Sequence, residues 1–319
     1  MLIAFIKRWT LPLAMITGVA GYFVLAALPQ LAPARPFLNQ SADLLLPLLI
    51  FGQLLLTFCK VERLGELRPC RWHGLLLLFQ LLSCLAVVAL LLHTPLPLNG
   101  RIVLEGLMVC LICPTATAAA VITAKLGGNA ATLTTYTLLS NLLAAVCVPL
   151  FFPMVEPHAG IGFAAAFLKI LGKVFPLLIL PFLLAWALRL YLPRVHALLM
   201  RYTGLAFYMW ALALVVVTAR TVNLLLNSEA TPALEWAIAL SGLLICAVQF
   251  FVGKRVGRRY GDLVSSGQAL GQKNTILAIW MSYAYLHPLS SIAPSSYVLW
   301  QNIYNAWQLY RKERKDAAA

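Results

Sequence analysis

The sequence predicts an all-α protein that crosses a lipid bilayer many times, and three observations support this prediction. Of the 319 residues, 62% are hydrophobic and only 11% are charged, which is far too apolar for a water-soluble domain. The apolar residues form long runs that short basic loops separate. Two of these runs carry proline or glycine together with polar residues near their middle. Such interruptions are tolerated inside a bilayer only where protein covers them or where they line a cavity.

Hydropathy divides the chain into ten candidate spans. Their bounds are about 11–29, 42–59, 74–93, 102–126, 129–154, 163–191, 201–222, 233–253, 262–286 and 293–311. The first apolar run could be taken for a signal peptide that follows Lys7 and Arg8. It is longer than such a peptide needs, so we expect a retained first helix.

Basic residues gather on one side of the predicted membrane. With ten spans, 18 of the 24 lysines and arginines fall in the loops and span ends on one side. Only Arg35, Arg101 and Arg220 fall on the other side, and the remaining three lysines lie within spans. The positive-inside rule therefore places both termini in the cytoplasm. The expected location is the plasma membrane, which in a bacterium is the inner membrane.

Ten spans divide into two halves of five, residues 1–155 and 161–319, joined outside the membrane by residues 156–161. Because five is an odd number, the second half enters the membrane from the opposite side, so related halves would be inverted repeats. The fourth span of each half is interrupted. The first reads CPTATAAAVITAKLGG from Cys113, and the second reads SGQALGQKNTIL from Ser266.

The expected break points are Pro114, which removes a backbone donor, and Gly271. Paired broken helices at corresponding positions indicate a transporter site. The alternative is two simple kinks in packed helices.

Lys273 lies near the middle of the ninth span, where a lysine costs roughly 2.5–3.5 kcal/mol on insertion scales. It is roughly 16 Å or more from either end of the span, which is too far for its side chain to reach the interface. The ammonium therefore needs an internal partner, a water-filled cavity or an anionic ligand. A buried lysine that carbonyls and amides hold for packing alone is the alternative.

The two breaks predict an anion-binding site. A broken helix offers backbone amides and the positive end of a helix dipole at mid-membrane. Neither break contains a carboxylate, and Lys273 adds a full positive charge. The expected substrate-binding residues are Thr115, Thr117, Lys273, Asn274 and Thr275. The solute would be a small organic anion.

The chain resembles the bile acid:sodium symporter family. The resemblance rests on the Pro114–Thr117 run, the threonine-rich fifth span and Gly271–Thr275 in the ninth. It implies a core of helices 3–5 and 8–10, a panel of helices 1, 2, 6 and 7, and a substrate site where broken helices 4 and 9 cross. It also implies transport by alternating access. Coupling-ion residues implied by the resemblance, or lying beside Lys273, are Thr137, Gln80, Gln268 and Gln272.

This chain departs from the family pattern at the sodium sites. Ala119 and Ala120 stand where the family carries a serine and an asparagine, and Ala269 stands in place of a shared glutamate. Lys273 replaces a glutamine. Sodium needs several oxygen ligands and usually a carboxylate, so we hypothesise that the Lys273 ammonium occupies the place of a sodium ion. Proton coupling through Lys273 is a companion hypothesis.

The predicted function is therefore secondary transport of an organic anion, a small carboxylate or a bile-acid-like amphiphile, without sodium coupling. A sodium symporter with altered sites is one alternative, and a non-transporting channel or ligand sensor is another. We expect no enzyme activity, cofactor, metal or nucleic-acid partner, because no catalytic triad, nucleotide motif or metal-ligand cluster occurs. The partners are the lipid bilayer and the solute, and the sequence leaves the oligomeric state open.

Overall fold

The computed structural model describes residues 2–28, 30, 33, 35–61, 65, 67–157 and 160–317. Helices make up 85% of the chain, which confirms the all-helical prediction. The expected connection at 156–161 and the basic loop that contains Arg63 lie partly outside the described residues. The chain divides into two compact units, one of residues 1–60 and 180–232 and one of residues 61–179 and 233–319.

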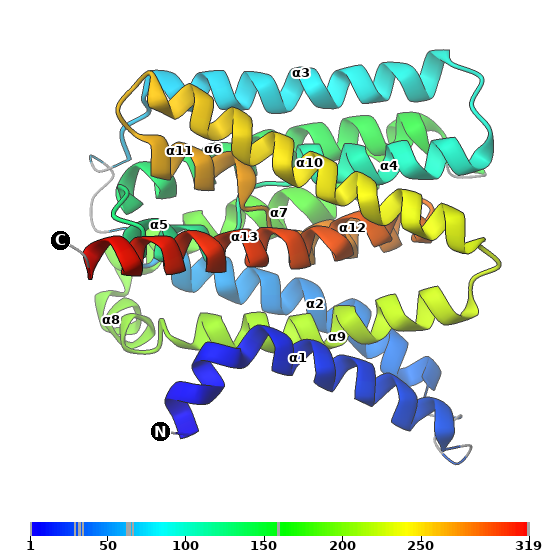
Figure 1. Cartoon of the computed structure of the whole chain (residues 1–319), viewed down its shortest axis with the longest axis horizontal. Coiled ribbons are helices and arrows are strands. Elements are labelled where there is room, and N and C mark those ends of the chain that lie inside the picture. The colour runs from blue at the N-terminus through cyan, green and yellow to red at the C-terminus, as the bar shows by residue number, and fades with distance from the viewer. Residues whose placement is uncertain are drawn as a thin grey trace. The chain divides into compact units, whose positions relative to one another are not determined.

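The first unit is a small helical assembly built around α9 (Leu205–Asn227). Helices α1 (Leu2–Ala27) and α2 (Arg35–Phe58) both pack against it (Figure 1). The unit also contains α8 (Pro193–Arg201) and the C-terminal part of α7 (Phe163–Tyr191), whose first part belongs to the second unit. An ion pair of 2.7 Å between Arg220 and Asp43 joins α9 to α2.

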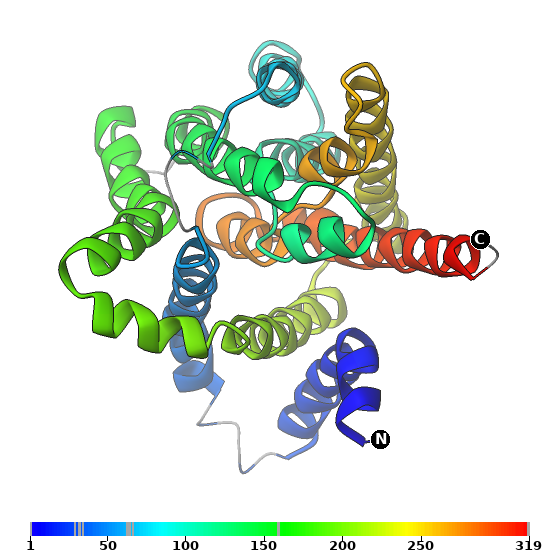
Figure 2. The same ribbon diagram turned by 90° about the vertical axis from the view of Figure 1, so that its left-hand side faces the viewer.

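The second unit contains the remaining helices. In chain order these are α3 (Arg71–His93), α4 (Leu98–Ile112), α5 (Ala119–Lys125), α6 (Ala130–Val155), α10 (Pro232–Arg258), α11 (Leu263–Gly271), α12 (Thr275–Tyr285), the 3₁₀-helix η3 (Pro288–Ser291) and α13 (Ile292–Asp316). Helix α3 packs against α4 and α6, and α12 packs against α13 (Figures 1 and 2).

Six described helices are long and apolar enough to cross a membrane. They are 36–58, Arg71–His93, Ala130–Val155, Phe163–Tyr191, Leu205–Asn227 and Pro232–Arg258. The apolar stretches Pro12–Ala27 and Thr275–Tyr285 are shorter. The expected fourth span is divided into α4 and α5, and the expected ninth into α11 and α12, so none of these four pieces alone has the length of a span. The ten-span inverted repeat remains a prediction.

Local sequence explains where three of these helices begin. Asn129, Asp262 and Asn274 are the N-caps of α6, α11 and α12, and their side chains accept hydrogen bonds from backbone amides of the first turn. Capping of this kind is the preferred way to satisfy amides that have no intrahelical partner. At the end of α5, Gly127 has φ +81°, a conformation that a residue with a side chain rarely adopts.

Candidate functional site

The two helix breaks meet within the second unit. Residues 113–118 separate α4 from α5, and residues 272–274 separate α11 from α12. The two non-helical segments form an isolated antiparallel bridge between Thr115 and Lys273. The Ala116 amide donates to the Gln272 carbonyl at 2.9 Å, and the Asn274 amide donates to the Pro114 carbonyl at 2.9 Å. The breaks therefore satisfy each other's backbone groups directly.

This pairing corrects one expectation about the anion site. The sequence predicts that amides at both breaks are available to a ligand, but four of them are already bonded. Besides the two paired amides, the Thr115 amide donates to the Ser140 hydroxyl at 3.2 Å. The Lys273 amide donates to Gln301 Oε1 at 2.9 Å. Because backbone donors in a bilayer must be satisfied internally, the crossing itself uses most of the amides that the breaks release.

The Thr115 side chain makes hydrogen bonds that hold the first break against α11 and α6. Its hydroxyl donates to the Ala269 carbonyl of α11 at 2.6 Å and lies 3.3 Å from the Ser140 hydroxyl, which donates to it. Tyr297 of α13 adds a hydrogen bond on the side of the second break, since its hydroxyl donates to the Gly271 carbonyl at 2.7 Å. All three hydroxyls are buried. Thr115 thus has a structural role at the break.

Lys273 is almost completely buried, with 1% of its surface exposed. Its Nζ donates to the Leu111 carbonyl at 3.4 Å. Leu111 is in the last turn of α4. The ammonium therefore lies at the C-terminal end of a half-helix, where the helix dipole is negative.

Two amide side chains share this position with Lys273. Gln80 Nε2 donates to the carbonyls of Ile112 and Cys113 at 2.9 and 3.2 Å, while its Oε1 accepts from Tyr136. Gln249 Nε2 donates to the Cys110 carbonyl at 3.1 Å. The carbonyl groups of the last turn of α4, which lack intrahelical partners, are thus capped by one ammonium and two carboxamides.

Thr117 and Asn274 differ from the other predicted site residues because both are only half-buried. Asn274 Oδ1 accepts from the Leu277 amide at 3.3 Å as the cap of α12. Among the described residues, no partner accepts from Asn274 Nδ2, and none bonds to the Thr117 hydroxyl. These two side chains therefore carry hydrogen-bonding groups beside the crossing that no described residue uses.

Three of the other predicted residues, Thr275, Thr137 and Gln268, have internal partners, and Gln272 differs from them. Thr275 lies 3.4 Å from Gln301 Nε2, Thr137 donates to the Leu133 carbonyl of its own helix at 3.0 Å, and Gln268 Nε2 donates to Asn305 at 2.9 Å. Gln272 is buried, and its Oε1 has no hydrogen-bond partner among the described residues. Asn141 is also buried, and both of its side-chain polar atoms lack a described partner.

An apolar cluster surrounds the alanines that flank the crossing. Ala119 begins α5, Ala269 lies two residues before the end of α11, and both are fully buried. The cluster around them consists of Trp72, Leu76, Leu133, Tyr136 and Leu270. The rings of Trp72 and Tyr136 stack with their centroids 5.9 Å apart.

Sequence reasoning missed Tyr297, Trp72 and Tyr136 as residues that shape the crossing. Each is one aromatic residue among many in an apolar helix, so neither its type nor its spacing distinguishes it. Gln249 and Gln301 make hydrogen bonds between helices, Gln249 to the Cys110 carbonyl and Gln301 to the Lys273 amide.

Two discontinuous helices that cross within one helical unit define a class of membrane protein to which many transporters belong. Residues 44–228 match the model of the Sodium Bile acid symporter family. The match covers more than half of the chain, so the protein belongs to this family of membrane transporters, as its sequence motifs indicated. No curated protein matches the chain. The matched residues include the first break, whereas the break at 272–274 lies beyond them.

Proposed function

We propose that this protein is a secondary-active transporter of an organic anion that works by alternating access without sodium coupling. The observation that carries the proposal is the position of the Lys273 ammonium against the carbonyl end of α4. In transporters with broken helices, such carbonyl ends are where sodium or a proton is held. A lysine tethered there supplies a positive charge from the chain itself.

The surroundings of Ala119 and Ala269 support the same conclusion. A sodium ion must replace its hydration shell with several oxygen ligands, and burying an unpaired charge in an apolar site is very unfavourable. At these positions the chain offers methyl groups packed against Trp72, Leu76 and Leu133. The chemistry of this cluster disfavours a bound cation.

The solute class follows from charge and from the free donors. Residues 113–118 and 272–274 contain one lysine and no acidic residue. The half-buried Thr117 hydroxyl and Asn274 carboxamide offer donors beside the crossing. An organic carboxylate, either small or attached to a larger apolar body, matches a site with a positive bias and neutral donors.

The membrane arrangement in the proposal is the ten-span inverted repeat with both termini in the cytoplasm. The two compact units supply the two bodies that alternating access requires. Paired breaks in the fourth and ninth expected spans support the repeat. The plasma membrane is the proposed location.

A thermal-shift screen of organic carboxylates on the purified protein tests the proposal. Ligands that bind only the folded state raise its stability by about 2.7 kcal/mol at a hundredfold excess over the dissociation constant. We expect a hit to give the same shift in sodium and in potassium buffers, and to lose it in Thr117→Val but not in the exposed control Thr94→Val. Counterflow of the labelled hit in proteoliposomes then distinguishes a carrier from a channel or sensor.

Sodium-coupled symport is the second candidate, favoured by membership of the family and by the presence of Thr137. It predicts that the carboxylate shift appears only when sodium is present. It also predicts that sodium alone stabilises the protein. Either result would replace the sodium-independent proposal.

A further inference from the structure

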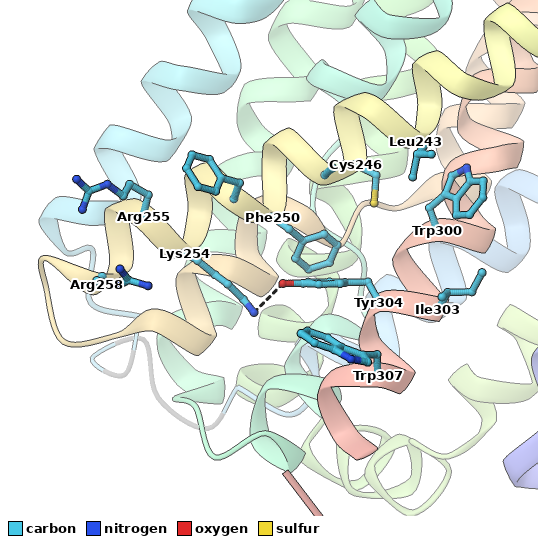
Figure 3. A pocket seen from close by; sticks show the side chains of 12 residues that line it. Leu243, Cys246, Phe250, Lys254, Arg255, Arg258, Trp300, Ile303, Tyr304 and Trp307 are labelled. Carbon is cyan, nitrogen blue, oxygen red and sulfur yellow. Dashed lines mark hydrogen bonds between the residues drawn. The ribbon is translucent and has the colours of Figure 1, made fainter. Parts of the chain in front are cut away.

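An open groove lies between α10 and α13 in the second unit, and Figure 3 shows the side chains that line it. Its volume is about 670 Å³. The residues that line it are Leu243, Cys246, Ala247, Phe250, Phe251, Lys254, Arg255, Arg258, Trp300, Ile303, Tyr304 and Trp307. None of them belongs to the two breaks, so the groove is separate from the candidate solute site.

The lining changes from apolar to basic along α10. From Leu243 to Phe251 every lining residue is apolar, and this stretch is about 12 Å long at the rise of an α-helix. Lys254, Arg255 and Arg258 follow within the next two turns. One leaflet of a bilayer has about 15 Å of hydrocarbon, with charged headgroups beyond it. The groove therefore has the polarity profile and the length of one leaflet.

Opposite α10, α13 contributes Trp300, Ile303, Tyr304 and Trp307, which share one helix face because of their spacing. Ile303 and Trp307 are exposed. Aromatic residues with one polar edge are typical of the membrane interface. This face thus combines an apolar wall with groups suited to the boundary between hydrocarbon and headgroups.

At the basic end of the groove, hydrogen bonds position Lys254, but no described acidic side chain pairs with the three cations. Lys254 Nζ donates to the Tyr304 hydroxyl at 2.9 Å and to Gln308 Oε1 at 2.6 Å, and it lies 4.9 Å from the centre of the Tyr304 ring. Figure 3 shows Arg255 and Arg258 beside it at the same end. Both arginines are exposed, and no described carboxylate forms an ion pair with either of them or with Lys254.

We propose that this groove binds an anionic phospholipid, with an acyl chain along Leu243–Phe251 and the phosphate at Lys254, Arg255 and Arg258. Charge complementarity selects this occupant, since three cations without an acid at the mouth of an apolar groove match a phosphate joined to acyl chains. A zwitterionic lipid would bring its own cation close to the arginines.

The groove also contacts the elements that hold the second break. A Cβ added to Gly271 would collide with the ring of Phe250, so Phe250 lies directly over the residue before the break. Trp300 precedes Gln301, which bonds the backbone of Lys273 through both its oxygen and its nitrogen. A lipid that fills the groove would therefore stabilise the α10–α13 packing around the crossing.

The test compares phosphatidylglycerol with phosphatidylcholine, added as detergent-solubilised lipids of the same chain length to the delipidated full-length protein. Thermal unfolding and native mass spectrometry measure stabilisation and retained lipid. We expect phosphatidylglycerol to bind more tightly. The double variant Arg255→Gln/Arg258→Gln should weaken this binding roughly tenfold to thirtyfold. The matched control Arg194→Gln/Arg201→Gln changes two exposed arginines of α8 and should retain it.

A second variant, Ala247→Phe, fills the groove while keeping every charge, and it too should lose the bound lipid. The proposal is wrong if both lipids bind equally, or if the α8 control loses as much affinity as the groove variant. Lipid would then be held only by nonspecific attraction between anionic headgroups and the basic protein. Equal binding of free glycerol phosphate would also overturn it, because the apolar wall would then contribute nothing.

Discussion

The ammonium nitrogen of Lys273 lies 3.4 Å from the carbonyl oxygen of Leu111, at the end of the first half of a broken helix. Helix α4 stops at Ile112, so the carbonyls of its last turn have no intrahelical donors. Lys273, Gln80 and Gln249 provide them. This arrangement explains how a lysine can lie deep inside a membrane protein, and it links the second break to the first.

Thr115→Val tests the fastening of the crossing. The substitution keeps the shape of the side chain but removes the donor to the Ala269 carbonyl, leaving a buried acceptor unpaired. We expect the free energy of unfolding to fall by about 1–3 kcal/mol. The matched control is Thr134→Val, whose hydroxyl bonds only to the Ala130 carbonyl of its own helix. Denaturant unfolding measures both variants. If they lose the same free energy of unfolding, the hydrogen bond from Thr115 to the Ala269 carbonyl does not stabilise the crossing more than a bond within one helix does.

Gln80→Leu tests the capping of α4. The change deletes donors to the Ile112 and Cys113 carbonyls inside the core, so we expect a loss of about 1–3 kcal/mol in unfolding free energy. Ser83→Ala on the same helix is the control, because its half-buried hydroxyl bonds only within α3. A Gln80→Leu protein as stable as the control would mean that water caps α4 equally well.

Asn274→Ala separates the structural role of this residue from its role in binding. Loss of the N-cap of α12 should destabilise the protein by about 0.5–2 kcal/mol, and loss of the carboxamide donor should abolish the thermal shift that a carboxylate ligand produces. Asn129→Ala removes the N-cap of α6 and should destabilise by a similar amount while keeping the ligand shift. The prediction fails if both variants keep the shift, or if both lose it.

Gly271→Ala tests the close packing beneath the groove. An alanine Cβ would collide with the Phe250 ring, so we expect destabilisation of about 1–3 kcal/mol. Gly74→Ala is the control, since nothing lies within 4 Å of a Cβ at that helical position. It should be neutral or stabilise by up to about 1 kcal/mol, because alanine favours the helix. Thermal unfolding of the two variants distinguishes the outcomes.

Sequence patterns predicted the helical membrane fold, the family and the location of both interruptions, because proline, glycine and a buried lysine violate the rules of a regular apolar span. Pro114 lies inside the non-helical segment 113–118, and Gly271 is the last residue of α11, directly before the non-helical segment 272–274. Polar and helix-breaking residues at corresponding places in two apolar spans can be recognised from the sequence alone.

The direction of the Lys273 side chain was not predictable in the same way. From the sequence, the Lys273 ammonium could face an anion, a cavity or carbonyl groups. Which of these it meets depends on the carbonyls at the end of α4, some 160 residues earlier in the chain. The hydrogen bond from the Ala116 amide to the Gln272 carbonyl also joins two segments whose sequences share no repeating pattern. Long-range pairing of this kind leaves no periodic signal in one sequence.

The most direct test of the account is the dependence of thermal stability on sodium in the wild type and in Lys273→Ala, with the exposed Lys125→Ala as control. If the ammonium stands in for a coupling ion, replacing potassium by sodium leaves the wild type and the control unchanged. Lys273→Ala should gain stability from sodium or methylammonium, since either can occupy the freed carbonyl end of α4. A wild type that sodium stabilises strongly, together with a Lys273→Ala variant that no cation stabilises, would contradict the account.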